Sequence, residues 1–79
     1  MLIRYFAGAA DAAGHENETV DAAGMTVGSL RSRLTDGNEQ LGKVLAVAAL
    51  LADGARVESD DDDLSDVSQL DILPPFAGG

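Results

Sequence analysis

The chain ends in two glycines, and this ending is the part of the sequence best suited to chemistry. Gly78 and Gly79 have no Cβ, so a backbone that ends in them can enter a narrow channel and bring its carboxylate against a reactive centre. The alternative is a disordered tip, which is common at chain termini. We expect the carboxylate of Gly79 to be the reactive group. Gly78, which has no side chain, would let this carboxylate enter a narrow active site.

The residues before the glycines are suited to form an arm. Pro74 and Pro75 each hold φ at about −65° and carry no N–H, so the chain must leave a β-sheet at this point. Phe76 has an apolar side chain that a partner protein could bind, and Ala77 follows it. A disordered tip alone does not explain two prolines and an aromatic residue here. We therefore expect residues 74–79 to project from the folded body as a semi-rigid C-terminal tail.

The rest of the sequence lacks the residues that other chemistries require. It contains no cysteine, which excludes disulfides, thiolate metal sites and thiol catalysis. No segment matches the phosphate-binding GxxxxGK[ST] loop, so we expect no ATP site in this chain. His15 has no second metal ligand nearby in the sequence, and residues 60–63 lack the spacing, turn glycine and closing glutamate of a calcium loop. We expect this chain to bind neither a metal nor a cofactor.

The charge balance disfavours polyanionic partners. Fourteen acidic and five basic side chains give the 79 residues a formal net charge of −9. Nucleic acids and anionic membranes are bound through Lys and Arg, so we expect neither as a partner. Arg4 and Asp11 interrupt the first apolar stretch, which is therefore no signal peptide, and no apolar run approaches the roughly 20 residues of a membrane span. These features predict one soluble, cytoplasmic domain over residues 1–79.

The apolar pattern predicts both strands and helices. The predicted strands cover residues 2–6, 19–20, 49–52, 56–57 and 69–73, and the prolines end the last one. Residues 7–17 are rich in small side chains and are predicted to be a loop. Thr26 and Asn38 are good N-cap residues for two helices, and Gly37 separates these helices. The Asp53-Gly54 pair indicates a hairpin turn.

This order of elements is typical of an α+β fold, the β-grasp of ubiquitin-like proteins. We expect a mixed sheet of four to five strands with the helices packed on one face. The first and last strands would form a parallel pair in the centre of the sheet, joined by a crossover that the helical segment supplies.

The other face of this sheet is expected to remain open. Because Asp71 prefers water, strand alternation turns Leu73 outward with it, and Phe6 likewise lies on the outer side of the first strand. We expect Val57 to join these two apolar side chains. A contiguous apolar patch beside a functional tail would serve as a docking surface, with Asp71 and neighbouring acids meeting basic groups of a partner at its rim.

The chain resembles the MoaD family of ubiquitin-like sulfur carriers, the small subunits of molybdopterin synthase, along its whole length. The resemblance rests on the first strand "LIRYFA" with the small-residue loop that follows, on "DDLSDVSQLDIL", and on the ending "PPFAGG". ThiS carriers of thiazole synthesis share the fold and the two glycines but generally lack the two prolines, which favours MoaD. The sequence departs from the family pattern at three places: Val67 for a turn glycine, Ala10-Asp11 for an Arg-Glu pair, and Ile72-Leu73 for a pair that is often two Phe.

The resemblance implies a sulfur donor within an enzyme complex, without catalytic groups of its own. A MoeB-type activating enzyme would use ATP to adenylate Gly79, and sulfide would displace AMP to leave a thiocarboxylate. The tail would then enter the large MoaE-type subunit and donate sulfur to a pyranopterin precursor, forming the dithiolene that binds molybdenum. The chain would thus work as part of a hetero-oligomer. Its partner-binding residues would be Phe6, Val57, Leu73, Pro74, Pro75, Phe76 and Ala77.

Three other functions remain open from the sequence. The chain could carry sulfur for thiazole and thiamine synthesis, or it could be a ubiquitin-like modifier that joins Gly79 to a lysine of another protein. The third alternative is a β-grasp interaction module whose tail has no role.

Overall fold

The computed structural model describes residues 1–75 of the chain. Phe76, Ala77, Gly78 and Gly79 lie outside the described residues, and the predictions made for these four residues are not tested by it.

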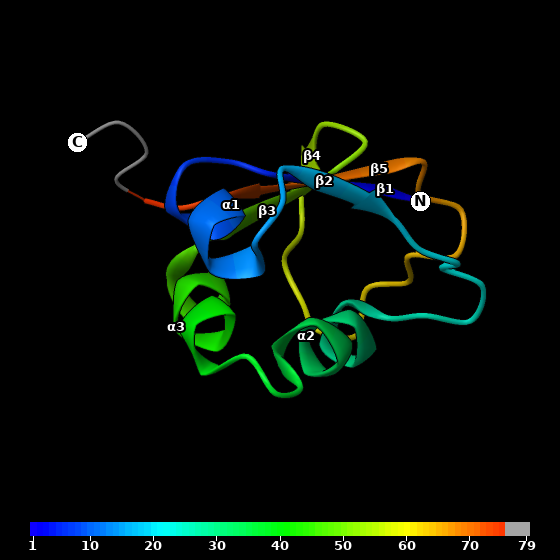
Figure 1. Ribbon diagram of the computed structural model, residues 1–79. Helices are drawn as coiled ribbons and strands as arrows, with labels where there is room; N and C mark the ends of the chain where they lie inside the picture. Colours follow the sequence, from blue (N-terminus) through cyan, green and yellow to red (C-terminus); the bar gives the residue numbers. More distant parts are fainter. Residues whose placement is uncertain (76–79) are drawn as a thin grey trace.

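Within residues 1–75, a five-stranded mixed sheet is covered on one face by three helices (Figure 1). The elements follow the order β1 (Leu2–Tyr5), α1 (Gly8–Ala13), β2 (Asn17–Thr19), α2 (Val27–Thr35), α3 (Glu39–Val47), β3 (Ala49–Ala52), β4 (Ala55–Arg56) and β5 (Gln69–Leu73). The strand order is β2-β1-β5-β3-β4, with β1 parallel to β5 and the other neighbours antiparallel. This is the predicted β-grasp, with the first and last strands paired in the centre.

Strand alternation decides what the sheet buries. Ile3 and Tyr5 on β1, and Leu70 and Ile72 on β5, all point into the core, as predicted. The helices below the sheet and the β4–β5 connection fill the rest of that core with Val27, Leu30, Leu41, Leu45 and Leu64. All of these residues are at most 4% exposed, so the domain has one continuous apolar interior despite its small size.

The segment after β1 differs from the prediction. Residues 7–17 were expected to be a loop, but Gly8–Ala13 form the short helix α1. Four of its six residues are alanine, the best helix former, and Ala9 is fully buried against the core. Gly14 ends the helix in the left-handed conformation, at φ 85°, and its amide donates to the Ala10 carbonyl. Small side chains here allow close packing, which a sequence pattern of small residues does not distinguish from a turn.

The predicted caps of the other two helices are confirmed. Thr26 accepts a hydrogen bond from the Ser29 amide, and the Ser29 hydroxyl accepts one from the Thr26 amide, forming a reciprocal cap for α2. Asn38 accepts from the Leu41 amide at the start of α3, and its side-chain amide donates to Ala12 in α1. Asn38 therefore both starts one helix and holds it to another.

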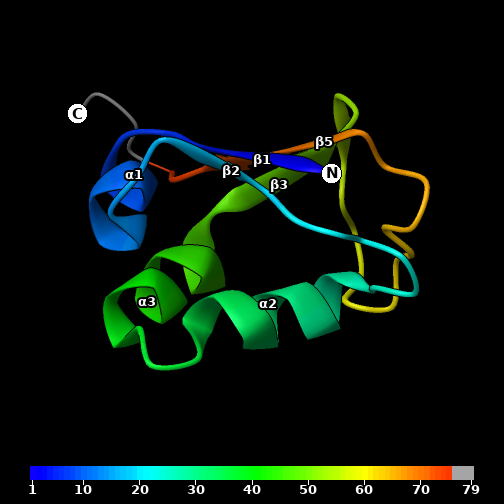
Figure 2. The same cartoon turned by 45° about the vertical axis from the view of Figure 1, so that its right-hand side comes forward.

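The acidic connection between β4 and β5 is fixed to the start of α2. It descends from the sheet to that helix and returns (Figure 2). The amides of Val27 and Gly28 donate to the Asp62 and Asp60 carbonyls, and a Cβ on Gly28 would lie only 3.3 Å from the Asp60 oxygen. The Asp62 carboxylate in turn accepts the amides of the loop itself. The Asp62 carboxylate thus has partners within its own loop.

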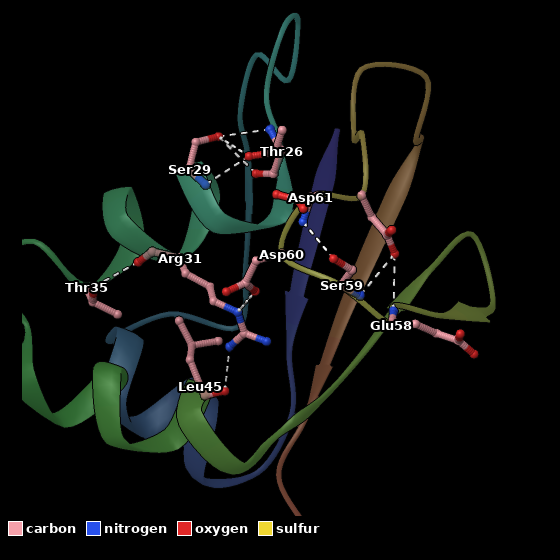
Figure 3. Close-up of polar contacts among 10 residues, drawn as sticks. Thr26, Ser29, Arg31, Thr35, Leu45, Glu58, Ser59, Asp60 and Asp61 are labelled. Atoms are coloured by element: carbon pink, nitrogen blue, oxygen red, sulfur yellow. Dashed lines mark hydrogen bonds and ion pairs between the residues drawn. The ribbon is translucent and has the colours of Figure 1, made fainter.

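Arg31 joins three elements (Figure 3). From α2 its Nε donates to the Asp60 carboxylate at 2.9 Å, and a terminal nitrogen donates to the Leu45 carbonyl near the end of α3 at 2.7 Å. A cation at a helix C-terminus also interacts favourably with the helix dipole.

The described part of the chain contains no helix that is long and apolar enough to cross a membrane.

We predict that Arg31→Met lowers the free energy of unfolding by about 1–2 kcal/mol, because it removes a hydrogen bond to a carboxylate and leaves the Leu45 carbonyl without that donor. Arg33→Met on the exposed side of the same helix is the matched control and should change stability by less than about 0.5 kcal/mol. Urea unfolding followed by circular dichroism measures both. Equal effects of the two variants would contradict the role assigned to Arg31.

Candidate functional site

The open face of the sheet has a central row of residues that crosses all five strands. Cross-strand pairing places Asn17 beside Arg4, Arg4 beside Asp71, Asp71 beside Leu51, and Leu51 beside Arg56. The three helices lie on the opposite face (Figure 1), so this row is directed away from them. Because directly paired residues share a face, the register fixes which side chains a partner meets there.

An ion pair lies in the middle of this row. Arg4 donates from Nε and a terminal nitrogen to the two carboxylate oxygens of Asp71, at 2.8 and 2.9 Å. These hydrogen bonds hold the pKa of the Asp71 carboxyl below its usual value, against the opposing effect of partial burial, and they raise the pKa of the Arg4 guanidinium. The guanidinium carbon also lies 5.2 Å from the centre of the Phe6 ring. Arg4 is therefore held on both sides, by a carboxylate and by an aromatic face.

Four apolar side chains surround this ion pair. Each is half-buried, and none belongs to the set that packs against the core. We call them the open-face cluster: Leu2, Phe6, Leu51 and Leu73. The Phe6 amide donates to the Ile72 carbonyl, which extends the β1–β5 ladder by one residue and places Phe6 beside Leu73. The predicted outward positions of Phe6 and Leu73 are thus confirmed, and the two are brought together.

The prediction for Val57 is wrong. Val57 is partly buried and packs against the core, on the helix side of the sheet. The two-residue turn at Asp53-Gly54 pairs Ala52 with Ala55 and Leu51 with Arg56, and the Val57 amide then donates to the buried Leu50. Counting outward from the turn would have shown this from the sequence, since a two-residue hairpin fixes the register. The apolar residue that β3 contributes to the open face is Leu51.

The charges of the open face include an ion pair that was not predicted. Asp71 was expected to meet basic groups of a partner at the rim, and within this chain it pairs with Arg4 on the surface of the sheet. Arg56 was not predicted as a site residue, yet it is exposed and has no ion pair or side-chain hydrogen bond with any residue in 1–75. The unpaired charge on this face is therefore positive.

The tail begins at the end of the central strand. Leu73, the last residue of β5, pairs with Ala49 of β3. The next residue, Pro74, is half-buried, and Pro75 is exposed. The two prolines end the strand, as predicted. A shallow groove of about 580 Å³ lies at the end of β1 and is lined by Arg4, Phe6 and residues of α1 and β2. The open-face cluster therefore continues into a depression near the start of the tail.

Glu18 on the edge strand β2 makes side-chain contacts with two residues. The Tyr5 hydroxyl donates to the Glu18 carboxylate at 3.0 Å, and burial together with this contact raises the pKa of Tyr5. His15 contacts the same carboxylate, and its ring meets the Tyr5 ring edge-on at 5.3 Å. His15 was predicted to be an exposed surface residue. It is half exposed but takes part in this edge contact.

No three His, Asp or Glu side chains in residues 1–75 are grouped so that they could hold a metal ion.

The fold and its open face define a small ubiquitin-like protein of the β-grasp class. A family model described as the ThiS family matches residues 3–79, and the chain belongs to that family. The match covers the two terminal glycines as well as the folded body. It establishes the family without separating its MoaD-like members from the others.

Two solved structures from Haloferax volcanii share the fold. The crystal structure of SAMP1 is similar with a TM-score of 0.71 and 22% identity, covering 100% of this chain and 98% of that one. The solution structure of the HVO 2177 protein is similar with a TM-score of 0.70 and 23% identity, covering 99% of this chain and 84% of that one. A comparison with curated proteins found no match.

The two faces of the sheet can be distinguished by a pair of substitutions. We predict that Val57→Asp lowers the free energy of unfolding by about 2 kcal/mol or more, because it places a charge against the core. Leu73→Asp, on the open face, should keep the native circular dichroism spectrum and lose less than about 1 kcal/mol. Thermal unfolding of both variants tests this assignment, and the reverse order of stabilities would contradict it.

The Arg4–Asp71 pair predicts a pH dependence of stability. Because the pKa of Asp71 is lowered in the folded state, its contribution is complete above the unfolded value of about 3.8 and is lost as the pH falls through the folded value. The stability advantage of the wild type over Asp71→Asn should therefore be present at neutral pH and shrink as the pH falls below the unfolded value of about 3.8. Arg4→Gln should remove the same pH-dependent contribution. Urea unfolding across this range checks it, and an advantage that stays constant would contradict the pairing.

Proposed function

We propose that this protein carries sulfur as a thiocarboxylate on Gly79 and is the small subunit of a molybdopterin synthase. The observation that carries the sulfur-carrier part of this proposal is the family match, which runs through the last two glycines. The proposal is further supported by the end of β5 at Leu73, where Pro74 and the exposed Pro75 cannot continue the strand. The reactive group would then be the chain's own carboxylate.

The chemistry is divided between this chain and its partners. A carboxylate is a poor acyl donor, so a MoeB-type enzyme would first join it to AMP from ATP, releasing pyrophosphate. Hydrosulfide would then attack the acyl carbon and displace AMP, leaving the thiocarboxylate. The loaded tail would enter a MoaE-type large subunit and give up its sulfur to the pyranopterin precursor. In this scheme ATP belongs to the activating enzyme, and the chain itself binds no cofactor.

The open-face cluster would hold the carrier against these partners. A few anchor side chains at the centre of an interface typically carry most of the binding free energy, and truncation of such an anchor costs about 2 kcal/mol or more. Phe6 and Leu73 lie beside the start of the tail, so a partner that binds them is also placed to receive the tail. Pro74, Pro75, Phe76 and Ala77 would form the arm that reaches the partner's active site, with Gly78 as the thin approach to Gly79.

The choice between the two sulfur pathways rests on the two prolines at the start of the tail. Pro74 and Pro75 favour the molybdopterin role, because thiazole carriers generally lack both prolines. The second candidate is sulfur transfer for thiazole synthesis, which the name of the matching family favours. Both use the same thiocarboxylate and differ in the protein that accepts the sulfur.

Intact-mass spectrometry tests the proposal directly. After incubation with the activating enzyme, ATP and a sulfur source, the mass should rise by the difference between one sulfur and one oxygen atom. A variant lacking Gly78 and Gly79 should show no change, and Leu73→Asp should react more slowly. An unchanged wild-type mass with an activating enzyme shown to work on its own substrate would sink the proposal.

Further assays with the loaded carrier separate the alternatives. Transfer of the sulfur to a molybdopterin precursor by an added large subunit favours molybdopterin synthase, whereas transfer to a thiazole synthase favours the second candidate. Diglycine remnants on lysines of other proteins, with no gain of sulfur, would indicate a protein modifier instead.

A further inference from the structure

The strand residues of the open face have the opposite net charge to the rest of the chain. Among the charged residues of the strands, Arg4, Arg56 and Asp71 lie on this face, whereas Glu18 contacts the hydroxyl of the buried Tyr5. The strand residues of this face thus include two of the five basic and one of the fourteen acidic side chains, a net charge of +1. The acidic Asp11 and Glu16 lie outside the strands and line the groove beside Arg4 and Phe6. The remaining residues hold three basic and thirteen acidic side chains, which leaves them a net charge of −10.

One of the two arginines has its charge compensated and the other does not. Arg4 gives two hydrogen bonds to Asp71 and packs on Phe6. Arg56 pairs with Leu51 across β3 and β4, so it borders the open-face cluster, and no residue in 1–75 accepts a hydrogen bond from its side chain. A partner that covers Leu51 would also displace part of the water that hydrates the Arg56 side chain. Its guanidinium then needs a new acceptor, because an unpaired charge is costly at a buried site.

We propose that the open face binds an apolar patch on the partner that carries a carboxylate, and that this carboxylate pairs with Arg56. This inference rests on the proposed function, in which the partner is the large synthase subunit. A carboxylate matches the planar fork of a guanidinium with two parallel hydrogen bonds, as Asp71 already does for Arg4 on the same face. The acidic surface elsewhere would repel the same partner group, so the charge pattern also selects the docking orientation.

Other occupants fit this face less well. A nucleic acid or an anionic membrane needs several cations together. This face offers the single uncompensated Arg56, which has the apolar Leu51 on one side and a depression lined by Asp62 and Asp63 on the other. Two copies of this chain meeting face to face would each present Arg56, and the carboxylate on that face is already held by Arg4. A separate partner with a carboxylate in an apolar patch can pair with Arg56 and cover Leu51 at the same time.

Binding of the purified large subunit to the uncharged carrier tests this pairing. Arg56→Glu should weaken the complex by about tenfold at low salt, mainly through slower association, and the effect should shrink at about 0.5 M salt. Arg56→Gln should give a smaller loss in the same direction. Arg33→Glu makes the same charge change on α2, on the far side of the molecule, and should leave affinity within about twofold. Leu73→Asp serves as the positive control for the face.

The possible outcomes separate this inference from the function on which it rests. If the wild type gains sulfur at Gly79 and binds the large subunit, but Arg56→Glu binds no more weakly than Arg33→Glu, the inference is wrong and the proposed function stands. Tighter binding by Arg56→Glu would show a basic partner and likewise overturn the inference. If the wild type neither gains sulfur nor binds, the proposed function fails and this inference fails with it. Self-association abolished by Leu51→Asp would assign the face to a second copy and also overturn it.

Discussion

The parallel pairing of β1 with β5 is the interaction on which the rest of the structure depends. It joins the two ends of the sequence at the centre of the sheet, with Ile3 beside Leu70 and Tyr5 beside Ile72 in the core. A slip of one residue would exchange the two faces of β5, because side chains alternate along a strand. The same register brings Arg4 to Asp71 on the open side. Core packing and the polar contact therefore specify one alignment together.

Much of this fold could be predicted from the sequence, because periodicity and caps are local signals. Thr26 and Asn38 mark the starts of α2 and α3, and the position of Asp71 correctly gives the inward and outward residues of β5. Helix α1 was missed because its six residues include no large apolar side chain that would mark a helical period, although four of them are alanine. Its formation depends on Ala9 reaching the core, which is a tertiary effect.

The candidate site was predictable only in part, because its surface is assembled from separate strands. Phe6 and Leu73 follow from alternation within their own strands, whereas Val57 required the register of a hairpin, and its side was misjudged. The role of Arg56 depends on what Arg4 and Asp71 do to each other's charge. A net charge of −9 gives no hint that the strand residues of one face have a positive net charge. Pairwise compensation becomes visible only when the strands are placed side by side.

The two outer strands of the sheet are very short: β2 has three residues and β4 has two. A neighbouring chain that tried to lengthen the sheet would find few free backbone amides and carbonyls to pair with. Growth of the sheet into fibrous assemblies is therefore disfavoured. Recognition is left to side chains, which evolution can alter one at a time without disturbing the ladder beneath them.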